Sequence, residues 1–306
     1  MMELIAVLLL LVFLSMGFAG AALADGMLPA LIAGQARSSW RRPIAEAARL
    51  LTTQRIRTEA PDALLWFLAP TLYLALAIVG LAVIPFGPGL VTIPSEVGIV
   101  VWGSCEALTI VAVFMFGWSA NAPLPLIGAY RYVAIALPAM LLSMFVLIGA
   151  ALPAESLAFT EIVEAQRTVW NVVRQPAGLI LFLMLGLAIS LRGPFDYAGP
   201  EDLAGGTTAD VSGPSLLAWK VARLAMLVSV SAVTATAFLG GYLGPLLPGF
   251  VWLALKTALV LIALVAAGNF FARMPPARMM GVIWTMLLPL SFLMLLAVGT
   301  ELLLWG

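Results

Sequence analysis

The 306-residue sequence is too apolar for a soluble protein, with 63% hydrophobic residues, 10% charged residues and a mean hydropathy of +1.11. Soluble domains carry about a quarter charged residues, so lipid must cover much of this chain. The net charge is zero, histidine is absent, and Cys105 is the single cysteine. This composition excludes a disulfide, a Cys-ligated iron–sulfur cluster, a His-ligated haem and the usual zinc sites. We therefore expect no metal or redox cofactor in this chain.

Eight apolar runs predict an all-α, polytopic membrane protein that forms a single integral membrane domain over residues 1–306. Each run reaches or approaches the ~20 residues that a helix needs to cross ~30 Å of hydrocarbon. Helices are expected because backbone groups in lipid must be satisfied within the segment. In chain order the expected spans are 3–24, 63–85, 98–118, 127–152, 175–191, 215–239, 249–272 and 279–304.

The first run also resembles a secretory signal, because residues 22–24 read Ala-Leu-Ala, as at a cleavage site. No basic residue precedes the apolar stretch, however, and the stretch is long enough to span. We therefore expect a retained first helix.

The distribution of basic residues predicts the orientation of the spans. With the segment after the first span in the cytoplasm, ten arginines fall on the cytoplasmic side and only Arg167 and Arg174 on the other. Lys220, Arg223 and Lys256 lie within spans. The cytoplasmic arginines are Arg37, Arg41, Arg42, Arg49, Arg55, Arg57, Arg131, Arg192, Arg273 and Arg278. The asymmetry places loops 25–61, 119–131 and 192–214 in the cytoplasm and both termini outside.

The segment 25–61 contains one further predicted element. From Pro43 to Leu51, the helical period gathers Ile44, Ala47, Ala48 and Leu51 on one face, while Glu46 and Arg49 point elsewhere. Proline suits the first turn of a helix. The pattern predicts an amphipathic surface helix lying along the membrane, on which a soluble partner can dock.

Several segments, in order along almost the whole chain, resemble one family. They are GQARSSWRRPIAEAARLL (34–51), APD (60–62), FLAP (67–70), AVIPFG (82–87), GWSAN (117–121), LIGAYR (126–131), EIVEAQ (161–166), RGPFD (192–196), SG (212–213), FLGG (238–241), LGP (243–245) and LKT (255–257). The chain resembles the subunit-H family of respiratory complex I, with its counterparts that anchor formate hydrogenlyase and other energy-converting hydrogenases. The resemblance implies the same eight-helix architecture.

The chain departs from this family where the resemblance implies buried glutamates in the fourth, fifth and sixth helices. Those positions correspond here to Met140, Ile189 and Arg223. After Asp196, the loop that is acidic in the family keeps Glu201, Asp202 and Asp210. The resemblance assigns the family's acids to quinone-site chemistry and proton coupling, so their absence counts against both in this divergent member.

Four ionisable residues of the predicted spans are candidates for function, because each costs ~2.5–3.5 kcal/mol on insertion scales and therefore needs a partner or a wet cavity. We expect Glu106 to pair with one of the cations Lys220, Arg223 and Lys256, giving an intramembrane polar track. Alternatively, Lys220 and Arg223 snorkel to the cytoplasmic surface.

The candidate docking residues lie in the cytoplasmic loops. Arg192 and Asp196, four residues apart, are expected to form an ion pair across the Gly-Pro turn, and Arg131 either braces its loop or serves as a positive-inside anchor. The full set is Arg37, Arg41, Arg42, Glu46, Arg131, Arg192, Asp196, Glu201 and Asp202. The basic members are suited either to an acidic partner or to anionic lipid headgroups.

The resemblance implies a cofactor-free subunit of a complex I-like or hydrogenase-like oxidoreductase in a bacterial cytoplasmic membrane. Its implied partners are the peripheral iron–sulfur subunits, a large hydrogenase-like or quinone-reductase-like subunit, and antiporter-like membrane subunits. Iron–sulfur clusters are expected in those partners, and a quinone is the one small molecule left open for this chain. The sequence carries no nucleotide or nucleic-acid motif. The alternative is an independent secondary transporter, although no internal repeat is visible.

Overall fold

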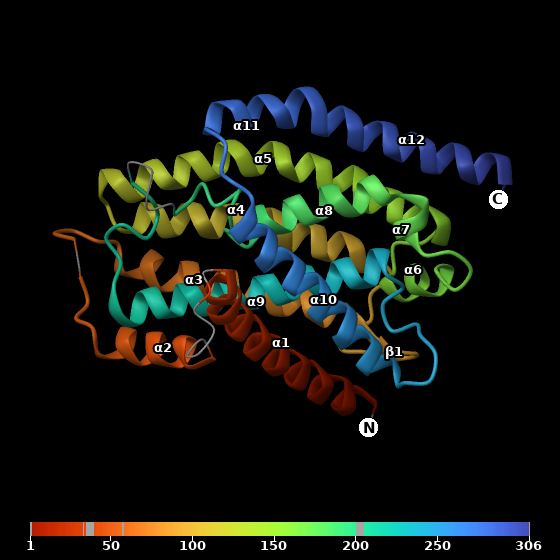
Figure 1. Ribbon diagram of the computed structural model, residues 1–306, viewed down its shortest axis with the longest axis horizontal. Coiled ribbons are helices and arrows are strands. Elements are labelled where there is room, and N and C mark those ends of the chain that lie inside the picture. The colour runs from red at the N-terminus through yellow and green to blue at the C-terminus, as the bar shows by residue number, and fades with distance from the viewer. Residues whose placement is uncertain (1, 33, 35–39, 57, 200–204, 306) are drawn as a thin grey trace.

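A computed structural model of the chain describes residues 2–32, 34, 40–56, 58–199 and 205–305. It confirms the predicted all-α, polytopic architecture (Figure 1). The elements are α1 (Met2–Ile32), α2 (Arg42–Thr52), α3 (Ala63–Ala82), β1 (Pro85–Gly87), β2 (Leu90–Val91), α4 (Gly98–Ser119), α5 (Pro123–Ala151), α6 (Phe159–Ala165), α7 (Asn171–Arg174), α8 (Pro176–Ile189), α9 (Gly213–Phe238), α10 (Gly249–Phe270), α11 (Pro276–Val282) and α12 (Leu288–Trp305). A π-helical turn joins the last two.

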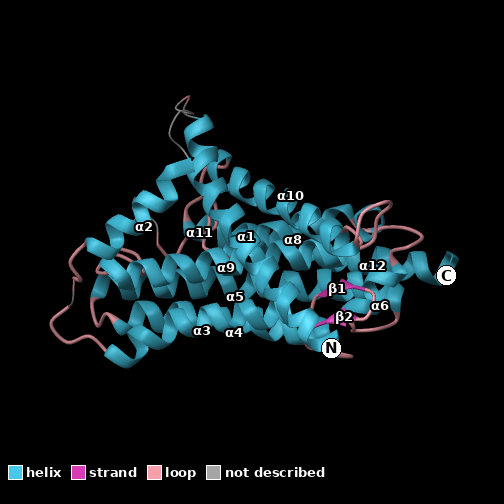
Figure 2. Cartoon of the chain, turned by 90° about the horizontal axis from the view of Figure 1, so that it is seen from below, coloured by secondary structure: helices cyan, strands magenta, loops and turns pink. Residues whose placement is uncertain are grey.

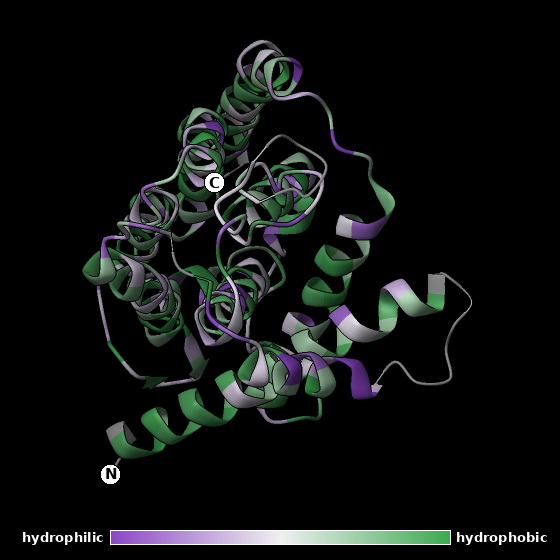
Figure 3. Ribbon diagram, turned by 90° about the vertical axis from the view of Figure 1, so that its left-hand side faces the viewer, coloured by the Kyte–Doolittle hydropathy of each residue, from purple (hydrophilic) through white to green (hydrophobic). Residues whose placement is uncertain are grey.

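Seven helices in the described part of the chain are long and apolar enough to cross a membrane. The long helices run side by side, and both chain ends lie at the same end of the bundle, as an even number of crossings requires (Figure 1). We call this the hairpin end, because β1 and β2 lie there (Figure 2). The opposite end, which carries α2, faces the viewer in Figure 3; we call it the basic end.

The first helix is longer than predicted, because α1 continues to Ile32 and so includes the start of the expected 25–61 loop. The hydropathy pattern breaks at Asp25, which predicts a helix end there. In the structure, Asp25 pairs with Arg192. The helix continues past Asp25, and the ion pair compensates the charge of its carboxylate.

The fifth expected span, 175–191, contains a helix of only 14 residues, α8. At 1.5 Å per residue it measures about 21 Å and falls short of the hydrocarbon thickness. The chain leaves the helix at Ser190, and Leu191 adopts a left-handed conformation with φ of 55°. The short helical turn α7 precedes α8 at the hairpin end. Backbone outside α8, at both of its ends, therefore completes the fifth crossing.

The small structures at the hairpin end are not predicted by hydropathy. β1 and β2 form an antiparallel hairpin in which Pro85 faces Val91 and Gly87 faces Leu90. The short helix α6 and a 3₁₀ turn at Leu152–Ala154 follow α5. These elements close the end of the bundle between the long helices.

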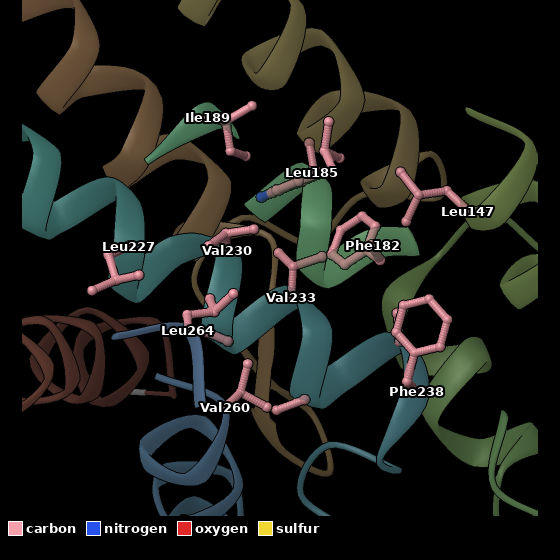
Figure 4. Packing of buried hydrophobic residues seen from close by; sticks show 14 of the residues in the cluster. Leu147, Phe182, Leu185, Ile189, Leu227, Val230, Val233, Phe238, Val260 and Leu264 are labelled. Carbon is pink, nitrogen blue, oxygen red and sulfur yellow. The ribbon is translucent and has the colours of Figure 1, made fainter. Parts of the chain in front are cut away.

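The core is organised around α9, the most thoroughly buried of the long helices. Leu227, Val230 and Val233 of α9 lie among side chains of α8 and α10 such as Phe182 and Leu264 (Figure 4). Two of its hydroxyl side chains are satisfied locally: Ser231 donates to the carbonyl of Leu227 and Thr234 to that of Val230, both at 2.7 Å. The helix can therefore be enclosed on all sides without orphaned hydroxyls at these two positions.

Gly128, near the start of α5, lies close to the 198–207 loop and offers a test of this contact. A Cβ there would lie 2.5 Å from the Ala198 carbonyl oxygen and 2.6 Å from both Gly206 Cα and Thr207 N. We expect Gly128→Ala to push the 198–207 loop off α5 and to lower the free energy of unfolding in detergent by about 1–3 kcal/mol. The matched control is Gly103→Ala, because a Cβ at Gly103 meets nothing within 4 Å. Equal thermal stability of the two variants would contradict this packing.

Candidate functional site

At the basic end, segments far apart in the sequence are joined by hydrogen bonds. Ser212 Oγ accepts from Ile56 N and donates to the Gln54 carbonyl oxygen, both at 2.7 Å. Thr58 Oγ1 donates to the carbonyl of Ala120 at 2.6 Å. The connector after α2 is thereby attached both to the start of α9 and to the turn between α4 and α5.

Two further bonds fasten the same connector to the α4–α5 turn. Asn121 Nδ2 donates to the Ala60 carbonyl oxygen at 3.1 Å, and Asp62 N donates to that of Ser119 at 2.9 Å. Asp62 also caps α3 by accepting from the amides of Leu64 and Leu65. Capping fixes the helix start, so the turn and the connector form one continuous surface.

The predicted amphipathic surface helix is confirmed as α2. Glu46 faces α9 and pairs with Lys220, and Leu50 is buried, whereas Ile44 and Leu51 are 65% and 61% exposed. Two members of the predicted apolar face are therefore left uncovered by the rest of the chain, which agrees with a face that lies along a membrane surface. Arg41 lies over the Trp40 ring, 4.9 Å from its centroid.

The 192–212 loop folds back onto the start of α5. Thr207 N donates to the Ala198 carbonyl oxygen at 2.7 Å, which closes the loop. Arg131 of α5 donates to the carbonyl of Gly205. Two roles were expected for Arg131, and this contact is the one expected if Arg131 braces the loop.

The expected ion pair between Arg192 and Asp196 does not form. Arg192 instead binds Asp25 through two hydrogen bonds of 2.5 and 2.7 Å, and Asp196 accepts from Arg273 at 2.6 and 2.9 Å. Both pairs are bidentate, which is the strongest geometry for guanidinium and carboxylate. They join the loop to α1 and to the segment before α11. Arg192 and Asp196, which are close in sequence, therefore each pair with a residue from another part of the chain.

Tyr197 holds the same loop from its buried side. Its hydroxyl donates to the Met274 carbonyl oxygen at 2.8 Å, and burial raises the pKa of Tyr197 to about 12. The hydroxyl therefore stays a donor throughout the physiological pH range. The predicted docking residues Arg37, Glu201 and Asp202 lie outside the described residues.

The four predicted members of the intramembrane polar track do not pair with one another. Glu106 is 2% exposed and accepts a hydrogen bond from Ser143 Oγ at 2.6 Å through Oε1; its Oε2 has no partner among the described residues. Lys220 pairs with Glu46. The expected Glu106–cation pair is therefore replaced by a hydroxyl contact.

Arg223 caps the end of α8. Its guanidinium donates to the carbonyls of Ser190 and Leu191, and Tyr73 Oη donates to the carbonyl of the preceding Ile189. The last carbonyls of a helix lack partners within the helix and carry partial negative charge. A cation is thus accommodated at one of the positions for which the resemblance implies a glutamate.

Lys256 lies toward the hairpin end, away from the other cations. Its Nζ donates to the carbonyls of Gly241 and Leu243 at 3.0 and 2.7 Å and lies 4.6 Å from the centroid of the Trp170 ring. These contacts stabilise a buried ammonium without a carboxylate. Lys256 therefore braces the turn after α9.

Sequence reasoning also missed a pair of buried amides at the hairpin end. Gln166 donates to the Thr236 carbonyl oxygen at 2.9 Å and accepts from Gly240 N at 2.9 Å, while Asn171 donates to the carbonyls of Ala150 and Ala237. Only the family-like stretch 161–166 pointed to this region. The amides join the ends of α5 and α9.

Glu164 lies beside this cluster and holds a surface contact. It accepts hydrogen bonds from Arg167 and from Tyr242 Oη, and these bonds lower the pKa of the Glu164 carboxyl. The contact faces solvent, so it contributes little to stability. In the described part of the chain, no group of three His, Cys, Asp or Glu side chains gathers as a metal site would require.

Comparison with known proteins matches residues 3–299 to the family described as NADH dehydrogenase. The chain belongs to the subunit-H family of NADH-quinone oxidoreductase. Two relatives from Rhodopseudomonas palustris are the subunit-H proteins of this oxidoreductase numbered 1 in strain HaA2 and 2 in strain ATCC BAA-98 / CGA009. The chain is 35% and 34% identical to them, respectively, over 257 residues, and each alignment covers 84% of this chain and 81% of the relative. The similarity of this subunit-H chain to its relatives thus extends over most of both sequences.

The cross-element ion pair at the basic end is open to a direct test. Arg192 is only 15% exposed in its side chain, so Asp25→Asn leaves a largely buried guanidinium without its carboxylate. We expect a loss of about 1–3 kcal/mol in the free energy of unfolding, with partial recovery in Asp25→Asn/Arg192→Gln. The control is Arg167→Gln, whose 60% exposed side chain should matter by less than about 1 kcal/mol. Equal losses in Asp25→Asn and Arg167→Gln would refute this assignment.

Proposed function

We propose that this chain is a cofactor-free membrane subunit of a complex I-like oxidoreductase, and that its basic end docks the iron–sulfur-bearing peripheral arm at the cytoplasmic face. The large subunit of that arm is either quinone-reductase-like or hydrogenase-like. Other faces of the bundle would meet antiporter-like membrane subunits, in a bacterial cytoplasmic membrane.

One feature of the basic end supports docking most directly. The connector 53–62, the α4–α5 turn and the 192–212 loop are hydrogen-bonded into one surface, with α2 fastened beside them through Glu46 and Lys220. Binding to a preorganised surface avoids the entropic cost of ordering its loops. A face built from three loops and held by cross-links suits docking better than it suits anchoring in lipid.

The surface chemistry agrees with a protein partner. Arg41 and Arg55 are exposed beside the exposed apolar side chains Trp40, Ile44 and Ile56. Arginine and aromatic residues are enriched at protein interfaces. Among the described residues, no structural feature specifically favours the alternative, an independent transporter. The relatives are named as oxidoreductase subunits.

The proposal assigns no quinone site to this chain alone. Between the 192–212 loop and α9, the basic end holds a cavity of about 80 Å³, whereas ligand pockets measure roughly 300–1,000 Å³. A quinone ring does not fit there. If a quinone binds near this end, the partner subunits must build most of its site.

Ion coupling, if the complex performs it, is assigned here to Glu106. It is a buried carboxyl of α4 whose Oε2 has no partner among the described residues, and ionisable groups at such positions mark ion pathways. Lys220, Arg223 and Lys256 are engaged elsewhere. The proposed coupling therefore depends on one carboxyl and its neighbour Ser143, without a chain of paired charges.

The docking proposal predicts the effect of reversing the exposed charges. We expect Arg41→Glu/Arg55→Glu to reduce, by about tenfold, the iron–sulfur subunits that co-purify with the tagged chain in mild detergent, as loss of ~1.4 kcal/mol of binding would do. The readouts are the iron and nickel content per mole of tagged chain and the partners identified by mass spectrometry. Arg167→Glu, the same change at the hairpin end, is the control. An equal loss of iron in the control would refute docking at the basic end.

The coupling proposal predicts a separation of two activities. In the intact complex, Glu106→Gln should leave electron transfer and assembly in place but lower the number of ions moved per electron, because glutamine cannot exchange a proton. Ser143→Ala keeps the carboxyl and should have the smaller effect. The ratio is measured in proteoliposomes from electron-transfer rate and internal pH change. An unchanged ratio in Glu106→Gln removes Glu106 from the pathway.

A further inference from the structure

The cavity at the basic end is lined by polar groups that lack partners. It measures about 80 Å³ and lies between the 192–212 loop and the first half of α9. Trp219 and Thr207 both line it and are 0% and 1% exposed, yet Trp219 Nε1 and Thr207 Oγ1 have no hydrogen-bond partner among the described residues. Buried polar groups in proteins are nearly always satisfied, so these two donors point to an occupant.

The indole donor is fixed in position. Trp219 stacks on Phe116 with ring centroids 4.0 Å apart and an interplanar angle of 7°, and it also contacts Tyr73. The ring cannot turn its N–H toward another partner without breaking this stack. Its orientation is therefore preorganised for whatever fills the cavity.

Arg223 supplies a full positive charge to the same cavity. It sits ten residues after the start of α9, about 15 Å along the helix, and forms no ion pair within the described residues. Its Nε and Nη2 donate to carbonyl oxygens, which carry no formal charge. The carbonyls of the α8 end offset at most about half a charge.

The neighbouring charges do not neutralise Arg223. Arg192 and Asp25 lie close by but are paired with each other. Asp196 lines the cavity, but Arg273 occupies both of its carboxylate oxygens. Among the described residues, Arg223 therefore has no carboxylate partner of its own, and a charge without a counter-ion in a largely buried position is costly.

We propose that this cavity binds one small monovalent anion, held by Arg223, Trp219 Nε1–H and Thr207 Oγ1–H. All three groups are donors, and an anion accepts from each while neutralising the guanidinium. Water would satisfy the two neutral donors but would not compensate the charge. The volume admits an ion of chloride's size with little accompanying water. This inference does not depend on the proposed function, because it concerns this chain alone.

Chloride binding to the purified full chain tests the proposal. In detergent, sodium chloride replaces sodium gluconate at constant ionic strength, and the apparent Tm and the ³⁵Cl NMR line width are recorded. The wild type should show a saturable rise in Tm and excess line broadening. Arg223→Gln should lose both effects. Trp219→Phe, which keeps the stack, and Thr207→Val, which keeps the shape, should each weaken chloride affinity about tenfold or more, so the test stands even if Arg223→Gln fails to fold.

Two controls establish that the chloride effect comes from this cavity. Lys220→Gln removes a cation one turn away on the same helix and should leave chloride binding unchanged. Glu201 and Asp202 lie outside the described residues, and Glu201→Gln/Asp202→Asn should likewise bind chloride as the wild type does. The proposal is overturned if the wild type shows no saturable chloride effect, if Lys220→Gln loses it as fully as Arg223→Gln, or if chloride binds only after the two acids are removed.

Discussion

The structure depends on the enclosure of α9. A membrane-embedded helix surrounded by other helices must satisfy every polar group it carries, because no water is present to do so. In the second half of α9, Ser231, Thr234 and Thr236 meet this demand locally, because their hydroxyls bond to the helix's own backbone. Its first half, however, carries Trp219, Lys220 and Arg223. These side chains need partners from other segments, and that need organises the basic end.

The two ends of the bundle solve the same problem differently. At the hairpin end, the neutral amides of Gln166 and Asn171 and the ammonium of Lys256 donate to carbonyls where α9 ends. At the basic end, bidentate ion pairs join the 192–212 loop to α1 and to the segment before α11. At the hairpin end, bonds within this chain thus bind the end of α9 to its neighbours. The basic end leaves exposed arginines and apolar side chains, as a surface that binds another protein does.

Hydropathy is sufficient to predict seven long helices and the surface helix α2, because spanning lipid imposes a length and a composition on each segment. Hydropathy does not predict the structure where a contact with a residue far away in the sequence determines it. Asp25 suggests a helix end unless Arg192, 167 residues away, is known to neutralise it. The expected pair Arg192–Asp196 fails because sequence spacing favours near neighbours, whereas the fold brings each residue a bidentate partner from elsewhere. The expected Glu106–cation pair fails because the three cations bind a carboxylate or carbonyls in other segments.

Hydrogen–deuterium exchange, recorded with and without the peripheral arm, tests the central claim that the basic end acts as one docking surface. The arrangement predicts that backbone amides of the connector 53–62, the α4–α5 turn and the 192–212 loop gain protection together on assembly. The turns at the hairpin end should exchange as before. Protection at the hairpin end alone, or at only one of the three basic-end segments, would contradict a docking face built from all three.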